Sequence, residues 1–194
     1  ANVDQVVLTF AAANPDINAN LIDRFIVLAE LSNLDVILCI NKMDCADSQQ
    51  IETIIDLYRN IGYTVLAVSA KLEIGIISLR DCLANKITVF AGPSGVGKST
   101  LLNSIHPGLK LATGEVSEKI GRGKHTTRYA ELLTLDHSGF VVDTPGFSLA
   151  EFKDIDEKQV MHCFREFKPY IEHCKFSSCM HAKEPQCAVK QAVL

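Results

Sequence analysis

The chain has 194 residues, a net charge of −4 and 47% hydrophobic residues. This length suits one full domain with a small additional domain, and the apolar content excludes intrinsic disorder. The negative charge argues against a domain that binds nucleic acid through general basicity, and it leaves a local basic patch or a ribonucleoprotein partner open. No apolar run reaches the roughly 18 residues that a membrane span needs, so we expect no membrane association.

The start of the chain and its cysteines indicate where the protein resides. The chain begins at Ala1 rather than at a Met and is already strand-like, so we expect an N-terminal part to be missing. Its first residues show no basic-then-apolar pattern, so we expect no signal peptide there. The chain has seven cysteines, and their odd number and the scatter of the first three indicate the reducing cytoplasm. Cys39 and Cys82 lie in apolar runs and are interpreted as packing residues.

Apolar β-rich runs alternate with helical patterns along the first half of the chain. Strands are predicted at residues 6–10, 36–40, 64–68 and 87–91, and helices at 20–31, 50–60, 76–83 and 98–105. Two further strands, at 129–135 and 140–142, are joined by a predicted hairpin turn. This alternation predicts an α/β fold with a mostly parallel sheet flanked by helices. A longer helical pattern follows at 156–168, and residues 187–194 look like a helix that is cut short.

Two motifs for nucleotide binding occur in an unusual order. Residues 92–99 match G-x-x-x-x-G-K-[ST], the phosphate-binding loop of P-loop NTPases. Residues 41–44 match N-K-x-D, the guanine-reading element of GTPases, and they come earlier in the chain. In ordinary GTPases the phosphate loop comes first. The pair therefore predicts GTP as the nucleotide, and the order predicts a circularly permuted GTPase domain of the P-loop type.

The glycine-rich motif is expected to bind the phosphates of the nucleotide. Its backbone N–H groups and the start of the following helix form an anion site. Lys98 would place its charge on the β and γ phosphates, and the Ser99 hydroxyl would be a ligand of Mg²⁺. The predicted phosphate-binding residues are Gly92, Pro93, Ser94, Gly95, Val96, Gly97, Lys98, Ser99 and Thr100.

Guanine recognition is assigned to Asp44, because a carboxylate can accept hydrogen bonds from both the ring N–H and the exocyclic amine of guanine. Asn41 would brace the loop, and the stem of Lys42 would lie along the base. The backbone groups of a short loop after the next strand would close the pocket. The predicted base-binding residues are Asn41, Lys42, Met43, Asp44, Ser69, Ala70 and Lys71.

Two further segments are predicted to sense the γ-phosphate. Residues 143–146 fit D-x-x-G, with Asp143 directed toward Mg²⁺ and the Gly146 N–H toward the phosphate. The polar, glycine-flanked loop 121–128 stands where a switch segment is expected. Either Thr126 or Thr127 would complete the Mg²⁺ shell, and Thr127 is favoured because other GTPase switches carry a similar Thr-Thr-Arg sequence. A solvated basic loop is the alternative interpretation of 121–128.

A cluster of cysteines and a histidine near the C-terminus has the composition of a structural zinc site. Three cysteines and one histidine form a closed ligand set with no open position for catalysis. The candidate ligands are Cys174, Cys179, His181 and Cys187. Packing cysteines or a redox pair are the alternatives, and His173 and Cys163 are nearby competitors. Zinc would replace the apolar core that so short a segment cannot build.

Four features occur together in this chain: the reversed motif order, the sequence Gly-Arg-Gly-Lys-His-Thr-Thr-Arg at 121–128, Asp-Thr-Pro-Gly-Phe at 143–147 and the Cys/His cluster. In this combination the chain resembles the RsgA/YjeQ family. This resemblance covers essentially the whole chain. It implies a GTPase that acts in late maturation of the small (30S) ribosomal subunit and its 16S rRNA. It also implies an RNA-binding OB-fold before the GTPase domain, which we expect to be absent from this chain, and His181 rather than His173 as the zinc ligand.

The resemblance also bears on catalysis. Ordinary GTPases carry a water-orienting glutamine after D-x-x-G, and Phe147 occupies that position here. The family implies His125 instead, since an imidazole can orient or deprotonate water near neutral pH. The expected catalytic residues are therefore His125, Lys98 and Thr127. A loop histidine without a catalytic role is the alternative.

The resulting prediction is a monomeric, cytoplasmic, Mg²⁺-dependent GTPase that is stimulated by the small ribosomal subunit. Residues 1–150 would form the permuted GTPase domain and residues 151–194 a truncated, helical zinc-binding domain. Two other classes compete with this interpretation. One is an ATP-using P-loop enzyme such as a small-molecule kinase, which Asn41 and Asp44 disfavour. The other is a non-catalytic zinc-dependent RNA-binding module, which Phe147 leaves open.

Overall fold

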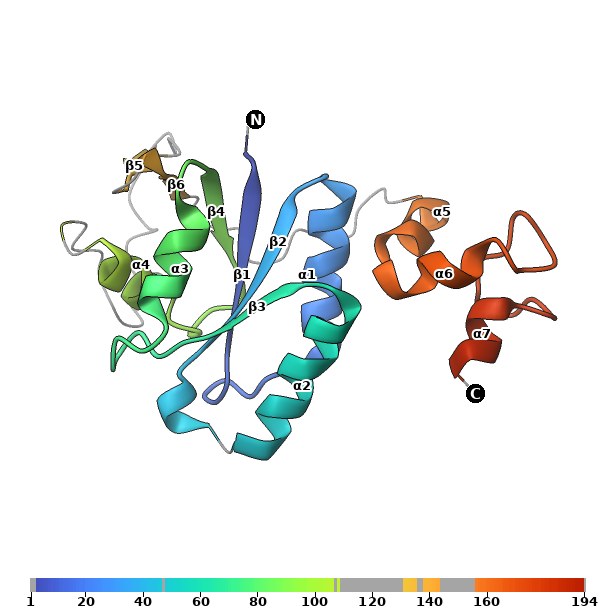
Figure 1. Ribbon diagram of the computed structural model, residues 1–194, viewed down its shortest axis with the longest axis horizontal. Helices are drawn as coiled ribbons and strands as arrows, with labels where there is room; N and C mark the ends of the chain where they lie inside the picture. The colour runs from blue at the N-terminus through green and yellow to red at the C-terminus, as the bar shows by residue number, and fades with distance from the viewer. Residues whose placement is uncertain are drawn as a thin grey trace, which may run out of the picture.

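A mostly parallel six-stranded sheet forms the centre of the part of the chain that the structure describes (Figure 1). The computed structural model describes residues 3–46, 48–106, 108, 131–135, 138–143 and 156–193. The strands are β1 (Gln5–Ala11), β2 (Asp35–Asn41), β3 (Thr64–Ala67), β4 (Ile87–Ala91), β5 (Glu131–Thr134) and β6 (Phe140–Asp143). Their order is β3-β2-β1-β4-β6-β5, and only the β5–β6 pair is antiparallel. The predicted α/β class is confirmed.

Helices cover both faces of the sheet (Figure 1). The helices α1 (Ala19–Leu31) and α2 (Ser48–Ile61) lie on one face, and α3 (Ile76–Leu83) and α4 (Lys98–Ile105) on the other. Successive strand residues point to opposite faces. In β1, Val6 and Leu8 accordingly pack with α1 and α2, whereas Val7 packs with α3 and α4. Both faces of the central strands are buried, which explains their continuous apolar runs.

Most predicted elements of the first half are confirmed within a residue or two. The helices predicted at 20–31 and 76–83 correspond to α1 and α3, and α2 ends just before Gly62, whose φ of 101° ends the helix. The predicted hairpin is confirmed by the antiparallel pairing of β5 with β6. Residues 129 and 130 of the first predicted strand, and 136 and 137 of the turn, lie outside the described residues. Cys39 is fully buried, in agreement with its predicted packing role. This burial raises the pKa of its thiol to about 12.

The single helix predicted at 156–168 is wrong. The structure has the short helix α5 (Glu157–Val160), a 3-10 turn at Met161–Cys163, an extended Phe164, a second 3-10 turn at Arg165–Phe167 and then α6 (Lys168–Ile171). The break places Arg165 against α1 and the turn between α2 and β3. Its Nε donates to Glu30 Oε1 (2.8 Å), and its guanidinium lies 4.1 Å from the centre of the Tyr63 ring. These tertiary contacts override the local helical pattern.

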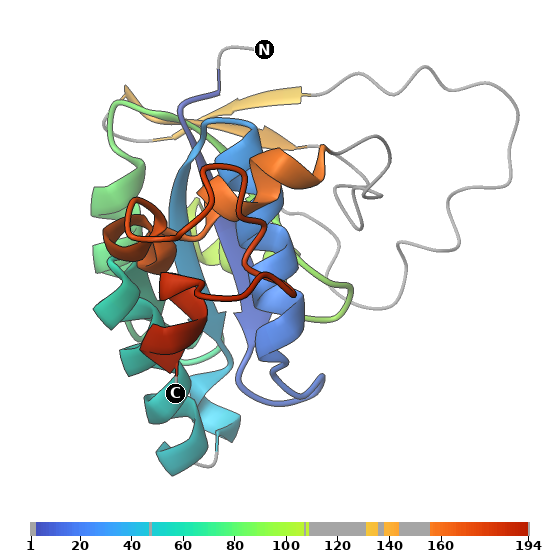
Figure 2. The same cartoon turned by 90° about the vertical axis from the view of Figure 1, so that its right-hand side faces the viewer.

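The C-terminal segment, residues 156–193, lies beside α1 and ends in α7 (Ala188–Val193) (Figures 1 and 2). Arg165 also donates from Nη1 to the carbonyl of Gly62 (3.0 Å), at the turn between α2 and β3.

The predicted domain boundary between residues 150 and 151 falls outside the described residues and stays a prediction. None of the helices in the described ranges is long and apolar enough to cross a membrane.

A buried hydroxyl in β1 leads to a prediction for stability. Thr9 is 0% exposed, and its Oγ1 has no hydrogen-bond partner among the described residues. An unpaired buried polar group costs about 1–3 kcal/mol, whereas valine has a similar shape and the same β-branch. Thr9→Val is therefore expected to raise the free energy of unfolding by about 1 kcal/mol, measured by urea denaturation.

The control for this variant is the same change in the neighbouring strand. Thr88 in β4 is equally buried, but its Oγ1 accepts a hydrogen bond from Gln5 Nε2 (2.9 Å). Thr88→Val removes that acceptor and should lower the free energy of unfolding. A Thr9→Val variant that is destabilised as much as Thr88→Val would contradict the assignment of an unpaired hydroxyl.

Candidate nucleotide-binding and metal sites

Asn41 joins the predicted nucleotide-binding motifs at one edge of the sheet. It lies at the end of β2 and is 2% exposed. Its Nδ2 donates to the carbonyl of Val96 in the phosphate loop (3.0 Å), and its Oδ1 accepts from the backbone N–H of Ala70 (3.1 Å). A single buried side chain thus connects the N-K-x-D motif to the glycine-rich loop and to the loop after β3.

Two glycines of the phosphate loop stand where no side chain fits. A Cβ on Gly92 would lie 2.0 Å from the carbonyl oxygen of Thr9 in β1. A Cβ on Gly97 would lie 2.6 Å from Asn41 Nδ2, and both glycines have a positive φ. The motif therefore requires glycine here for close approach as well as for backbone conformation.

Lys98 begins α4, and its side chain folds back over the phosphate loop. Its Nζ donates to the carbonyls of Gly92 and Pro93, both at 2.7 Å. Burial lowers the pKa of this ammonium. Ser99 follows in the first turn of α4 and is half-buried. The ammonium and the N-terminal backbone of α4 provide positive charge at the loop that the sequence assigns to phosphate.

Asp44 presents a carboxylate at the surface, beside the loop after β3. Its Oδ1 accepts from the Ser69 hydroxyl at 2.6 Å, and this hydrogen bond lowers the pKa of the carboxyl. Asp44 is therefore held in the ionised form, which can accept two hydrogen bonds from a guanine edge. Only backbone groups of Ser69 were predicted to take part in the site, and the role of its hydroxyl was missed. The sequence did contain a signal for this role, because a hydroxyl residue directly follows the strand predicted at 64–68.

A loop between β1 and α1 reaches the same site and was not predicted to do so. The Nζ of Lys42 donates to the carbonyl of Asn14 in this loop. Pro15 Cδ lies 3.8 Å from the position that a Cβ on Gly95 would take. The signal available in the sequence was position, since this loop also follows the carboxyl end of a parallel strand, where ligands bind in such sheets.

The predicted switch elements fall largely outside the described residues. This holds for the whole loop 121–128 with His125, Thr126 and Thr127, and for Gly146 and Phe147. Asp143 ends β6, whose backbone pairs with β4, the strand before the phosphate loop. The side chain of Asp143 is not among those described.

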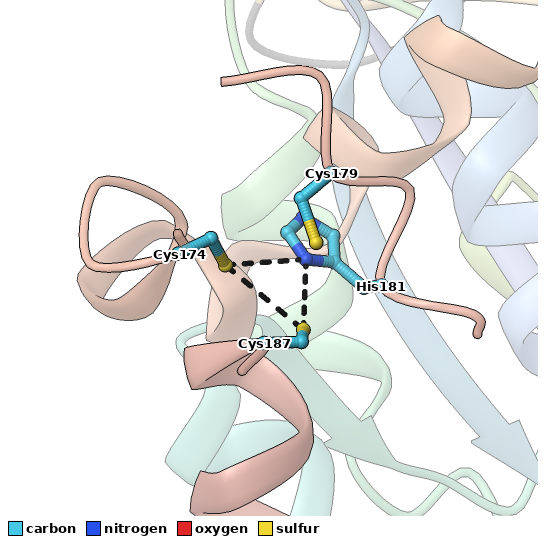
Figure 3. Close-up of side chains that lie close together, drawn as sticks. All are labelled: Cys174, Cys179, His181 and Cys187. Atoms are coloured by element: carbon cyan, nitrogen blue, oxygen red, sulfur yellow. Dashed lines mark hydrogen bonds between the residues drawn. The ribbon is translucent and has the colours of Figure 1, made fainter. Parts of the chain in front are cut away.

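The four predicted metal ligands come together in the C-terminal segment (Figure 3). Their donor atoms all lie within 4.8 Å of one another. His181 Nδ1 lies 3.6 Å from Cys174 Sγ and 3.4 Å from Cys187 Sγ, and the two sulfurs are 3.9 Å apart. Cys179 and Cys187 are buried, and Cys174 and His181 are half-buried.

This geometry fits a tetrahedral zinc ion. With zinc–sulfur distances of about 2.3 Å and zinc–nitrogen distances of about 2.0 Å, the sulfurs stand about 3.8 Å apart and sulfur and nitrogen about 3.5 Å apart. The three distances among Cys174, His181 and Cys187 are close to these values. The Cys179 sulfur lies within 4.8 Å of each of the other donor atoms. His173 is not in the cluster, and Cys163 instead donates from its Sγ to the carbonyl of Gln159 (3.4 Å).

A mostly parallel sheet with a phosphate loop after β4, and with a guanine-reading motif earlier in the chain, defines a circularly permuted P-loop GTPase domain. A family model described as RsgA GTPase matches residues 1–153. The chain therefore belongs to the RsgA GTPase family.

Relatives of known sequence or structure cover the whole chain. The small ribosomal subunit biogenesis GTPase RsgA of Caldanaerobacter subterraneus subsp. tengcongensis is 48% identical, over 100% of this chain and 65% of its own length. The crystal structure of YjeQ from Thermotoga maritima is 42% identical with a TM-score of 0.85, over 100% of this chain and 65% of that one. YloQ, a circularly permuted GTPase, is 42% identical with a TM-score of 0.79, over 99% and 61%. The chain thus spans just under two thirds of these proteins' length.

Proposed function

We propose that this chain binds GTP and hydrolyses it to GDP and phosphate. The observation that carries the proposal is the pair of hydrogen bonds from Asn41 to Val96 and Ala70. They hold the guanine reader at a fixed distance from the phosphate loop, so one nucleotide can contact both. Asp44, ionised and braced by Ser69, would accept from the guanine edge, and adenine has no matching pair of donors.

The phosphate end would be bound by the backbone of residues 92–97 and by Lys98. When nucleotide binds, the Lys98 ammonium would exchange the carbonyls of Gly92 and Pro93 for phosphate oxygens. Ser99, Asp143 and Thr127 would hold Mg²⁺, which neutralises charge on the phosphates. The γ-phosphate would hold Thr127 and Gly146 and so order the two switch loops, and hydrolysis would release these loops.

The C-terminal cluster is proposed to hold one structural zinc ion through Cys174, Cys179, His181 and Cys187. The donor set and its spacing support this assignment. Residues 151–194 would then form a zinc-binding domain distinct from the GTPase domain at 1–150.

We further propose that the intact protein acts in late maturation of the small (30S) ribosomal subunit. Its relatives' names support this partner, and the resemblance in sequence supports contact with 16S rRNA. The protein would act as a monomer in the cytoplasm. A phosphate-release assay with the intact protein, GTP and purified small ribosomal subunits tests the proposal. Turnover should rise well above the rate without subunits, and an unchanged rate would instead favour a non-catalytic binding module.

His125 is proposed to orient or activate the attacking water, because Phe147 cannot. His125→Ala is expected to lose subunit-stimulated turnover and to keep the GTP affinity of the wild type. Removing a general base or water-positioning group costs about 100-fold or more in rate. His162→Ala, which removes an exposed histidine of the C-terminal segment, serves as the control and should keep stimulated turnover. Wild-type turnover in His125→Ala would overturn the assignment.

A further inference from the structure

All four metal ligands lie on one stretch of irregular backbone. Cys174, Cys179, His181 and Cys187 fall between α6 and α7, and no helix or strand is formed between them. Two residues of this stretch have a left-handed backbone, His181 with φ 58° and Gln186 with φ 55°. Such a conformation is unfavourable for residues other than glycine, so neighbouring contacts must hold it in place.

The carboxylate of Glu184 supplies those contacts. Its Oε1 accepts from the backbone N–H of Met180 (2.9 Å), and its Oε2 accepts from the N–H groups of Ala182 and Lys183, both at 3.0 Å. Met180 and Ala182 are the residues immediately before and after His181. One side chain therefore binds the backbone on both sides of the ligand.

The ring of His181 lacks the support that metal-bound histidines usually have. Such a histidine normally donates its second ring N–H to a carboxylate, a carbonyl or water, which fixes the ring orientation. Here Nε2 is buried and has no hydrogen-bond partner among the described residues. The ring of Phe167 packs edge-on against the imidazole, with the ring centres 5.6 Å apart, but it offers no acceptor.

We propose that Glu184 is the positioning residue of the metal site: by binding the backbone N–H groups on both sides of His181, it aims Nδ1 at the sulfurs of Cys174 and Cys187. The Glu184 carboxylate positions His181 through the backbone. In other metal sites a carboxylate instead accepts a hydrogen bond from the second ring nitrogen of the histidine. This inference rests on the zinc site proposed above. Glutamine at position 184 retains one acceptor oxygen and turns an NH₂ donor toward backbone donors, so it should not hold the loop.

Competition with a chromophoric zinc chelator tests the inference on the 194-residue chain. Glu184→Gln is expected to bind zinc about 10–100-fold more weakly than the wild type, the usual cost of losing a residue that orients a ligand. The absorption spectrum of the cobalt-substituted protein should change as well, because the tetrahedral geometry is distorted. Glu172→Gln removes the same charge from an exposed residue two positions before Cys174 and should leave affinity and spectrum unchanged.

GTP affinity, measured on the same samples, reports whether the nucleotide-binding fold is intact in each variant. Wild-type zinc affinity and spectrum in Glu184→Gln would overturn the positioning role. Equal weakening by Glu184→Gln and Glu172→Gln would overturn it too, since charge alone would then explain the effect. A wild-type chain that binds no zinc would instead refute the proposed zinc site itself, so the two failures can be told apart.

Discussion

Replacing Asp44 with asparagine is expected to weaken GTP binding by about 100-fold or more. The carboxylate of Asp44 would accept from the ring N–H and from the exocyclic amine of guanine. Asparagine keeps one acceptor and turns its own NH₂ toward the guanine amine, so at least one charge-assisted hydrogen bond of about 1.5–3 kcal/mol is lost and two donors face each other. The Ser69 hydroxyl can still donate to the asparagine oxygen, so the loop should keep its shape.

The same substitution should improve the binding of xanthosine triphosphate. Xanthine carries an oxygen where guanine carries the exocyclic amine, and the asparagine NH₂ can donate to that oxygen. Calorimetric titration of the wild type and of Asp44→Asn with both nucleotides measures this exchange of specificity. Asp81→Asn, which removes an exposed carboxylate on α3, is the control and should bind GTP like the wild type. Unchanged GTP affinity in Asp44→Asn, with no gain for xanthosine triphosphate, would contradict the assigned role.

Removal of zinc is expected to unfold residues 168–193 and to leave the sheet folded. The buried apolar cluster of this segment consists of Cys179, Cys187 and Val189, and two of these are proposed metal ligands. So small a core cannot offset the conformational entropy of the segment. A structural zinc ion contributes on the order of 10 kcal/mol to the folding of such a unit.

Hydrogen exchange of the backbone amides, followed with and without a chelator, measures this effect. Amides in 168–193 should lose their protection in the chelated protein and in Cys187→Ser, whereas amides in β1 and β4 should keep theirs. Cys45→Ser alters an exposed cysteine outside the cluster and should retain zinc and protection. Protected amides throughout 168–193 in the zinc-free protein would show that the segment folds without metal.

The nucleotide motifs and the elements that carry them could be predicted from the sequence because their signals are local. An apolar run of four to seven residues followed by a glycine-rich or N-K-x-D motif needs no distant partner to be interpreted. The bounds of α3 and β4 agree with the prediction for this reason. Asn41 was predicted only to brace its loop, and its two partners, Val96 and Ala70, became known from the structure.

The features that were missed depend on partners that are distant in sequence. The break at Phe164 is set by Arg165, which binds Glu30, 135 residues away. Helical periodicity contains no information about such a partner, so residues 156–168 were predicted as one helix. The contact of Lys42 with Asn14 likewise joins two loops whose approach is decided by the sheet order.

Titration of the chain with GTP, GDP and ATP under identical conditions tests the central claim most directly. The claim is that Asp44 and the phosphate loop, joined through Asn41, form a site for a guanine nucleotide. GTP and GDP should bind with similar affinity. ATP should bind at least about 100-fold more weakly than GTP, because adenine cannot donate two hydrogen bonds to the Asp44 carboxylate. Equal affinities for GTP and ATP would contradict the account.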